Sequence, residues 1–188
     1  YGSGLYNTAV GYEALEDFTT GHSNVAVGYG AGKDITTSHY NVLVGYEAGK
    51  SITTGTGRSV LIGTFAGDAQ TTSDYNVAIG YLALTDNQVG SDNVVLGGNA
   101  GNKLLGPENT IVGTYAGDAL TTSSGSVVIG NNALTTATTD KYGVAIGWEA
   151  MKLTPAGLAL ETTIAIGYRA MYGSGATSGI SGNVAIGS

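Results

Sequence analysis

The chain has 188 residues, a formal net charge of -7 and no cysteine. This acidic balance argues against nucleic acid or an anionic membrane surface as the main partner, because either would need clustered Lys and Arg side chains. The lack of cysteine rules out disulfides, zinc–thiolate sites and iron–sulfur sites. Direct membrane insertion is not expected either, because no apolar run approaches the roughly 18 residues of a spanning helix.

A five-residue pattern, Asn-Val-Ala-Val-Gly at residues 24–28, returns in similar form along the whole chain. Its closing glycine recurs at intervals of 16 to 20 residues, and an alanine stands three residues after each of the first ten glycines. The glycines are Gly11, Gly28, Gly45, Gly63, Gly80, Gly97, Gly113, Gly130, Gly147, Gly167 and Gly187. Such short repeats cannot bury their own apolar faces and must stack on one another. We therefore predict one repetitive domain over residues 1–188, an all-β parallel solenoid of about ten coils.

The three residues before each glycine, such as Val-Leu-Val at 42–44, are β-branched or apolar and predict a short strand. The middle residue is also apolar, which is typical of parallel strands covered on both faces. A coil of this length covers one face only, so a second chain is expected on the other. Because the middle side chain is often a small alanine, it is the predicted site of close approach between subunits. The predicted intersubunit core is Ala26, Leu43, Leu61, Ala78, Val95, Ile111, Val128, Ala145 and Ala165.

A weaker apolar position lies seven residues past the glycine, as at Ile35 and Ile52, although Gln70 and Asn87 interrupt it. It predicts a second short strand in each coil. Ten coils at a strand spacing of about 4.8 Å would make a rod about 48 Å long.

The strand pattern Asn-Val-Ala-Ile-Gly followed by an alanine resembles the head repeats of trimeric autotransporter adhesins. The longer coils here, with Gly-Tyr-x-Ala-Leu at 11–15 and Thr-Thr-Gly at 19–21, look like repeats of phage tail-fibre and large bacterial surface proteins. The resemblance covers the whole chain. It implies a left-handed β-roll, a closely packed or intertwined homotrimer, and an extracellular location on a cell surface or virion. Because the chain begins at Tyr1, already in phase with the repeat, a fragment of a longer fibre protein is expected.

Aromatic residues follow several of the glycines, and two interpretations of them stay open. They form a ladder that packs coil on coil, or they are exposed rings that stack on the sugar faces of a receptor glycan. The last two repeats are 20 residues long, so loops near residues 154–160 and 172–182 are further places for specificity. Neutral insertion explains these loops equally well. The candidate receptor contacts are Trp148, Pro155, Tyr172, Tyr29 and Tyr46.

The predicted function is a structural and adhesive segment of a trimeric extracellular fibre, which attaches to a host cell surface or acts as a rigid spacer. Its partners would be two further copies of the chain and a cell-surface glycan or protein receptor. No catalytic, metal or cofactor site is predicted. His22 and His39 hold corresponding places in neighbouring repeats and are expected to stack. Paired threonines such as Thr36-Thr37 leave an ice-binding or surface-adsorbing solenoid as the alternative, and a polysaccharide-degrading solenoid is third.

Overall fold

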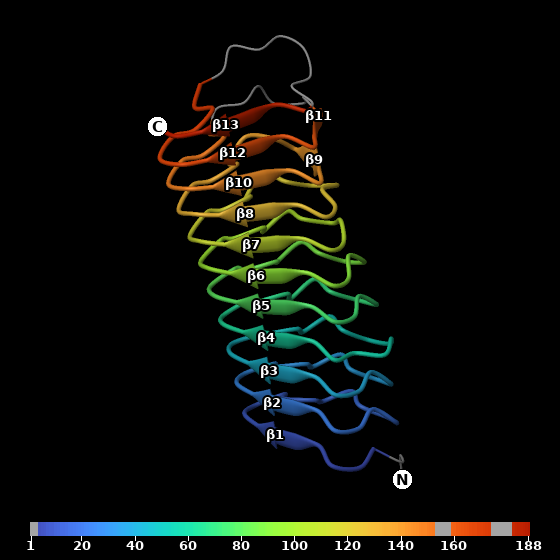
Figure 1. Cartoon of the computed structure of the whole chain (residues 1–188). Helices are drawn as coiled ribbons and strands as arrows, with labels where there is room; N and C mark the ends of the chain where they lie inside the picture. The colour runs from blue at the N-terminus through green and yellow to red at the C-terminus, as the bar shows by residue number, and fades with distance from the viewer. Residues whose placement is uncertain (1–3, 153–158, 174–181) are drawn as a thin grey trace.

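The computed structural model describes residues 4–152, 159–173 and 182–188. The chain winds as a stack of coils, and each coil contributes one short strand to a continuous parallel sheet that runs from the N-terminus to the C-terminus (Figure 1). This eleven-stranded sheet follows the order β1-β2-β3-β4-β5-β6-β7-β8-β10-β12-β13. The strands are β1 (Thr8–Val10), β2 (Val25–Val27), β3 (Val42–Val44), β4 (Val60–Ile62), β5 (Val77–Ile79), β6 (Val94–Leu96), β7 (Thr110–Val112), β8 (Val127–Ile129), β10 (Val144–Ile146), β12 (Ile164–Ile166) and β13 (Val184–Ile186). The predicted all-β parallel solenoid is confirmed.

Neighbouring strands pair with equivalent residues of the repeat side by side. Ala26 pairs with Leu43, and Leu43 pairs with Leu61. Each position of the repeat therefore forms a column along the rod, and a property shared by that position becomes a stripe on the molecule.

The predicted second strand in each coil is wrong for most of the described coils. Only β9 (Thr139–Lys141) and β11 (Ala159–Glu161) form a second, two-stranded sheet. Elsewhere the buried Ile35 and Ile52 lie in irregular backbone directly after a turn, although the backbone N–H of Thr36 still donates to the carbonyl of Thr53 in the next coil. A single apolar residue among Thr, Ser, Asp and Gly favours a turn over a strand, because these small polar residues bond locally to the backbone.

The predicted intersubunit core lies inside the coil of a single chain, so that assignment is wrong. The middle strand residues are shielded from solvent by their own chain and pack with the repeat alanines and with residues such as Ile35 and Leu104. These buried middle residues are Ala26, Leu43, Leu61, Ala78, Val95, Ile111, Val128, Ala145 and Ala165. Side chains alternate along a strand, so it is the two flanking residues of each triplet that point outward. The small middle side chain suits the narrow interior of the coil.

The closing glycines stack on one another at a corner of the coil. At Gly97 the φ angle is +137°, and a Cβ atom there would lie 2.6 Å from the carbonyl oxygen of Gly113 in the next coil. Neither the backbone conformation nor the available space admits an L side chain. This close approach explains why glycine recurs once per repeat.

The asparagines before the strands form a buried ladder along the coil interior. The carboxamide of Asn41 donates to Oδ1 of Asn24 at 3.0 Å, and the same oxygen accepts the backbone N–H of Asn41 at 3.0 Å. Asn76, Asn93 and Asn109 repeat the arrangement. Each amide thus satisfies the backbone of the next coil, as buried polar groups require.

Candidate functional site

The outward face of the eleven-stranded sheet is an uncharged, largely apolar strip, which we call the outer sheet face. Of its members in the described strands, only Thr8 and Thr110 are polar. Most of its side chains are half-buried by their neighbours along the sheet. The more exposed members are Ile79, Val94 and Ile129 within the sheet and Val10, Val184 and Ile186 at its two ends. The apolar members are Val10, Val25, Val27, Val42, Val44, Val60, Ile62, Val77, Ile79, Val94, Leu96, Val112, Val127, Ile129, Val144, Ile146, Ile164, Ile166, Val184 and Ile186.

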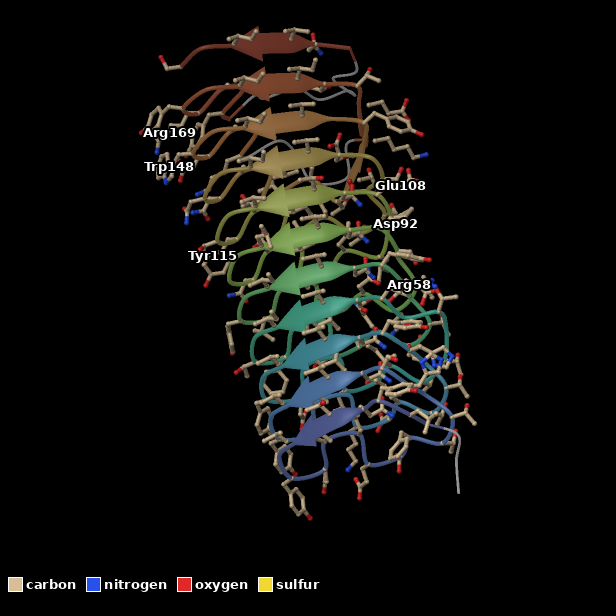
Figure 2. All side chains as sticks on the ribbon, turned by 60° about the horizontal axis from the view of Figure 1, so that its bottom comes forward. Arg58, Asp92, Glu108, Tyr115, Trp148 and Arg169 are labelled. Carbon is tan, nitrogen blue, oxygen red and sulfur yellow. The ribbon has the colours of Figure 1, made fainter. Side chains whose placement is uncertain are left out.

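Two different corners border this strip. Figure 2 shows Tyr115, Trp148 and Arg169 beyond one end of the strands, and Arg58 and Glu108 beyond the other. The aromatic residues that follow the closing glycines belong to the first corner. The sheet therefore lies between two rows of exposed side chains.

The predicted aromatic ladder is present near the N-terminus. Tyr29 stacks on Tyr12 with ring centroids 5.5 Å apart, and on Tyr46 with centroids 5.0 Å apart. Phe65 closes the series with an edge contact to Tyr46 at 5.3 Å. The ring faces of the candidate receptor residues Tyr29 and Tyr46 are thus largely used by neighbouring rings, although both side chains remain exposed.

Trp148 and Tyr172 belong to a second aromatic group near the C-terminal end of the sheet. Trp148 stacks on Tyr168 with centroids 5.1 Å apart and an interplanar angle of 8°. The guanidinium carbon of Arg169 lies 5.0 Å from the ring centroid of Trp148, 5.4 Å from that of Tyr168 and 4.6 Å from that of Tyr172. The structure thus brings Trp148 and Tyr172 to the same cation. Pro155 lies outside the described residues.

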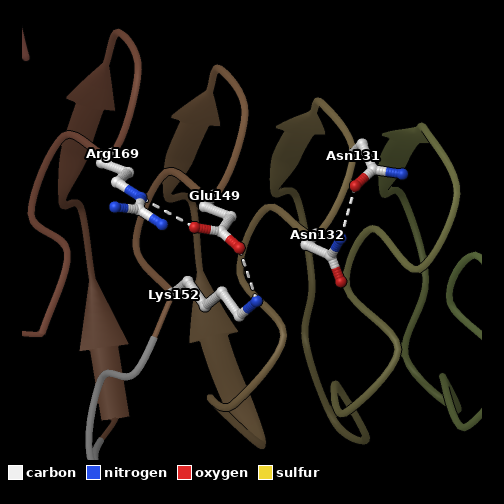
Figure 3. Close-up of polar contacts among 5 residues, drawn as sticks. All are labelled: Asn131, Asn132, Glu149, Lys152 and Arg169. Atoms are coloured by element: carbon white, nitrogen blue, oxygen red, sulfur yellow. Dashed lines mark hydrogen bonds and ion pairs between the residues drawn. The ribbon is translucent and has the colours of Figure 1, made fainter.

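Glu149 ties this aromatic group to two cations (Figure 3). Its carboxylate accepts from Nζ of Lys152 at 2.7 Å and from Nε of Arg169 at 2.8 Å. Burial alone would raise the pKa of the Glu149 carboxyl, but the hydrogen bonds from Lys152 and Arg169 outweigh it and the pKa lies below its ordinary value. The Glu149 carboxylate is therefore ionised at neutral pH, and Glu149, Lys152 and Arg169 together carry a formal charge of +1. Sequence reasoning missed Glu149, Lys152 and Arg169, because their meeting depends on the 20-residue spacing between Glu149 and Arg169.

A third group lies at the opposite corner. The predicted stacking of His22 on His39 is confirmed, with ring centroids 4.0 Å apart. Arg58 lies between two tyrosine rings, 5.5 Å from the centroid of Tyr40 and 5.3 Å from that of Tyr75. Among the described residues, no three His, Cys, Asp or Glu side chains are arranged to hold a metal ion.

The first threonine of most pairs donates its hydroxyl to a backbone carbonyl of the next coil, as Thr19, Thr36, Thr53, Thr71 and Thr121 do. The hydroxyl of Thr36 donates to the carbonyl of Thr53 at 2.8 Å, and that of Thr121 donates to the carbonyl of Thr138 at 2.8 Å. These hydroxyls are used within the fold, which gives the ice-binding alternative little support.

No helix in the described part of the chain is long and apolar enough to cross a membrane. Comparisons of the chain with protein-family models, with curated proteins and with solved structures give no match.

Proposed function

We propose that this chain is a segment of a homo-oligomeric extracellular fibre, assembled through the outer sheet face. The observation that carries the proposal is the continuity of that face. It runs over all eleven strands without a charged residue. A parallel sheet exposed to water on one side would be expected to carry polar side chains there, since parallel sheets are normally covered on both faces.

The strip has the size of a functional surface patch. Eleven strands at about 4.8 Å spacing, each three residues long, give a projected area of roughly 500 Å². This approaches the upper end of the roughly 300–600 Å² found for the largest apolar patch of a monomer, and such patches are often functional. The partner with matching shape and chemistry is another copy of the same strip. Copies aligned side by side around an axis parallel to the rod would bury all strips together.

The resemblance to trimeric adhesin and tail-fibre repeats favours three chains and a left-handed coil. A bundle of three such rods would act mechanically, as a stiff spacer. It would also present three copies of any surface site, which turns weak contacts into avidity. We therefore place the chain on a cell surface or virion, in attachment to a host cell.

The proposal is tested by the molar mass of the chain in solution and of two double variants. Val44→Asp with Ile62→Asp places two carboxylates on the outer sheet face of neighbouring strands. Thr54→Asp with Thr56→Asp adds the same charge at exposed positions outside the strands. Both pairs are on the surface of a single chain, so both variants are expected to fold, which circular dichroism checks.

Light scattering should give three times the 18.8 kDa chain mass for the unmodified protein and for the threonine variant. The outer-face variant should give 18.8 kDa. An unmodified chain that is monomeric, or an outer-face variant that stays assembled, would show that the strip is not the contact between copies.

A further inference from the structure

Three tyrosines near the N-terminus, Tyr12, Tyr29 and Tyr46, form a column that we call the tyrosine ladder. Their strands β1, β2 and β3 pair with equivalent residues side by side, so the ring after each closing glycine lies against the ring of the next coil. Tyr12 and Tyr29 are nearly parallel, at 5.5 Å and 19°, and Tyr29 and Tyr46 are closer to parallel, at 5.0 Å and 9°. All three side chains are exposed. An oxidant in solution can therefore reach each phenol while another phenol lies beside it.

Carboxylates lie beside the two outer phenols of the ladder. The hydrogen bond from Lys33 lowers the pKa of the Glu13 carboxyl, and a further hydrogen bond from the Tyr12 hydroxyl acts in the same direction. The negative charge of Glu47 raises the pKa of the Tyr46 phenol, and a hydrogen bond between the two groups adds to this effect. A carboxylate within hydrogen-bond reach can accept the phenol proton when the ring loses an electron. These contacts favour formation of a neutral tyrosyl radical.

The ladder ends where the next ring lacks a phenol. Phe65 contacts Tyr46 edge-on, with centroids 5.3 Å apart, and has no hydroxyl proton to lose. Tyr81 follows its closing glycine as the ladder tyrosines do, but the equivalent positions of the two adjacent coils hold Thr64 and Gly98. An exposed tyrosine of the same row is thus available for comparison, without a tyrosine at the equivalent position on either side.

From this arrangement we propose that the tyrosine ladder is an oxidative cross-linking site, at which a peroxidase-type oxidant joins neighbouring rings as dityrosine. Each of two phenols gives up one electron and one proton, and the two radicals form a bond between ring carbons ortho to the hydroxyls. The two ortho hydrogens then move as protons to the phenol oxygens, which restores both aromatic rings. Hydrogen peroxide takes up the two electrons and two protons and is reduced to two water molecules.

The geometry favours coupling within the chain over coupling between chains. Rotations of exposed side chains take picoseconds to nanoseconds, so a ring about 5 Å away is met long before a second molecule arrives. Each bond would join residues 17 positions apart in sequence and connect two neighbouring coils covalently. The chain has no cysteine, so a disulfide cannot supply such a connection. Closing these loops restricts the unfolded chain, and the cross-link therefore stabilises the coils that it joins.

The experiment treats the intact chain, at low concentration, with a haem peroxidase and hydrogen peroxide, and then with trypsin. Cleavage after Lys33 and Lys50 gives the peptides 1–33 and 34–50. Coupling of Tyr12 to Tyr29 should leave peptide 1–33 lighter by two hydrogen atoms. Coupling of Tyr29 to Tyr46 should join the two peptides, and fragmentation in the mass spectrometer locates the bond. Absence of both products, or cross-links between chains alone, would overturn the proposal.

Tyr29→Phe tests the ladder without removing a ring, because phenylalanine keeps the stacking surface and lacks the hydroxyl. Dityrosine fluorescence of the oxidised variant should fall at least about tenfold, since both couplings use Tyr29. Tyr81→Phe is the matched control from the same row, and it should leave the fluorescence unchanged. Equal losses in the two variants would contradict the site.

Two further measurements test the carboxylate and the stabilising effect. Glu47→Gln should lower the yield of joined peptides several-fold relative to the coupled peptide 1–33, and an unchanged ratio would refute proton transfer to Glu47. Oxidation should raise the urea midpoint of the unmodified chain and leave that of Tyr29→Phe where it was. An unchanged midpoint in the cross-linked chain would refute the stabilising role.

The cross-linking site goes beyond the proposed fibre and does not depend on its assembly. The variant Val44→Asp with Ile62→Asp should give the same products within one chain even when it is monomeric. A monomeric native chain that forms them would refute the fibre assembly and leave the cross-linking site standing, whereas an assembled chain without them would do the reverse.

Discussion

The carboxylate of Asp140 occupies the space that a side chain at Gly143 would need. A Cβ at position 143 would lie closer to both oxygens of Asp140 than van der Waals contact allows. Most other coils carry asparagine or serine at this place and continue the buried amide ladder. Here Asp140 fills the gap instead, with 1% of its surface exposed.

This replacement predicts a stability that depends on pH. Burial raises the pKa of the Asp140 carboxyl to about 6 from its ordinary value of 3.8. The folded chain therefore holds a proton that the unfolded chain has lost, so stability is full below about pH 4 and falls as the pH rises toward 6. The difference between these two pKa values corresponds to roughly 3 kcal/mol of stability. Urea midpoints measured from pH 4 to pH 7 should show this fall.

Asp140→Asn is the matching variant, because its neutral amide keeps the size of the side chain. It should remove most of that pH dependence and raise the midpoint at pH 7. A midpoint at pH 7 that drops in the variant would mean that the carboxylate has a stabilising partner.

The stacked histidines predict an effect of the opposite sign. Burial lowers the pKa of His39, and the positive charges of His22 and Arg58 act in the same direction. Nδ1 of His39 also accepts the backbone N–H of His22 at 3.2 Å, which requires that nitrogen to be unprotonated. Stability from this contact is present above the ordinary histidine pKa of about 6.5 and is lost as the pH falls below it. Hydrogen exchange at the His22 amide should accelerate in that range. An exchange rate that does not change as His39 becomes protonated would contradict the hydrogen bond from the His22 amide to Nδ1 of His39.

Two buried amides in the coil interior are expected to cost stability. Gln70 and Asn87 continue the column of Ile35, Ile52 and Leu104, and the described residues give their side-chain atoms no hydrogen-bond partner. Replacing each with leucine should raise the free energy of unfolding by about 1–3 kcal/mol, because the desolvation penalty disappears. Urea denaturation measures the gain. A loss of stability in both variants would show that the amides are satisfied by internal water.

Gly97 and its neighbour Gly98 give a controlled test of why glycine recurs at the end of each strand. Gly97→Ala should cost several kcal/mol or prevent folding, because its φ is +137° and the carbonyl of Gly113 lies in the way. At Gly98 no atom comes nearer than 3.9 Å to a Cβ, and no left-handed conformation is required. Gly98→Ala should be neutral or stabilising by up to about 1 kcal/mol. Similar thermal midpoints for the two variants would contradict the stacking of the closing glycines.

The repeat alone predicted the coils, the strands and the stacking of His22 on His39, since residues one repeat apart become neighbours in any solenoid. It could not say which side of a strand faces inward. Val42, Leu43 and Val44 are all apolar, so hydrophobicity does not separate the inner residue from the outer two. The contacts of Glu149 with Lys152 and Arg169 could not be predicted either, because they form where the repeat lengthens and the regular spacing of the earlier coils no longer applies.

The central claim, that the outer sheet face is where copies of the chain meet, is tested most directly by crosslinking. The chain has no cysteine, so Val44→Cys and the exposed Thr54→Cys each carry a single thiol for a short bismaleimide. At low protein concentration, Val44→Cys should give covalent pairs at twice the 18.8 kDa chain mass, because equivalent residues lie together around the axis. Thr54→Cys should stay at 18.8 kDa. Val44→Cys that remains single, or crosslinking that is equal at both positions, would contradict the account.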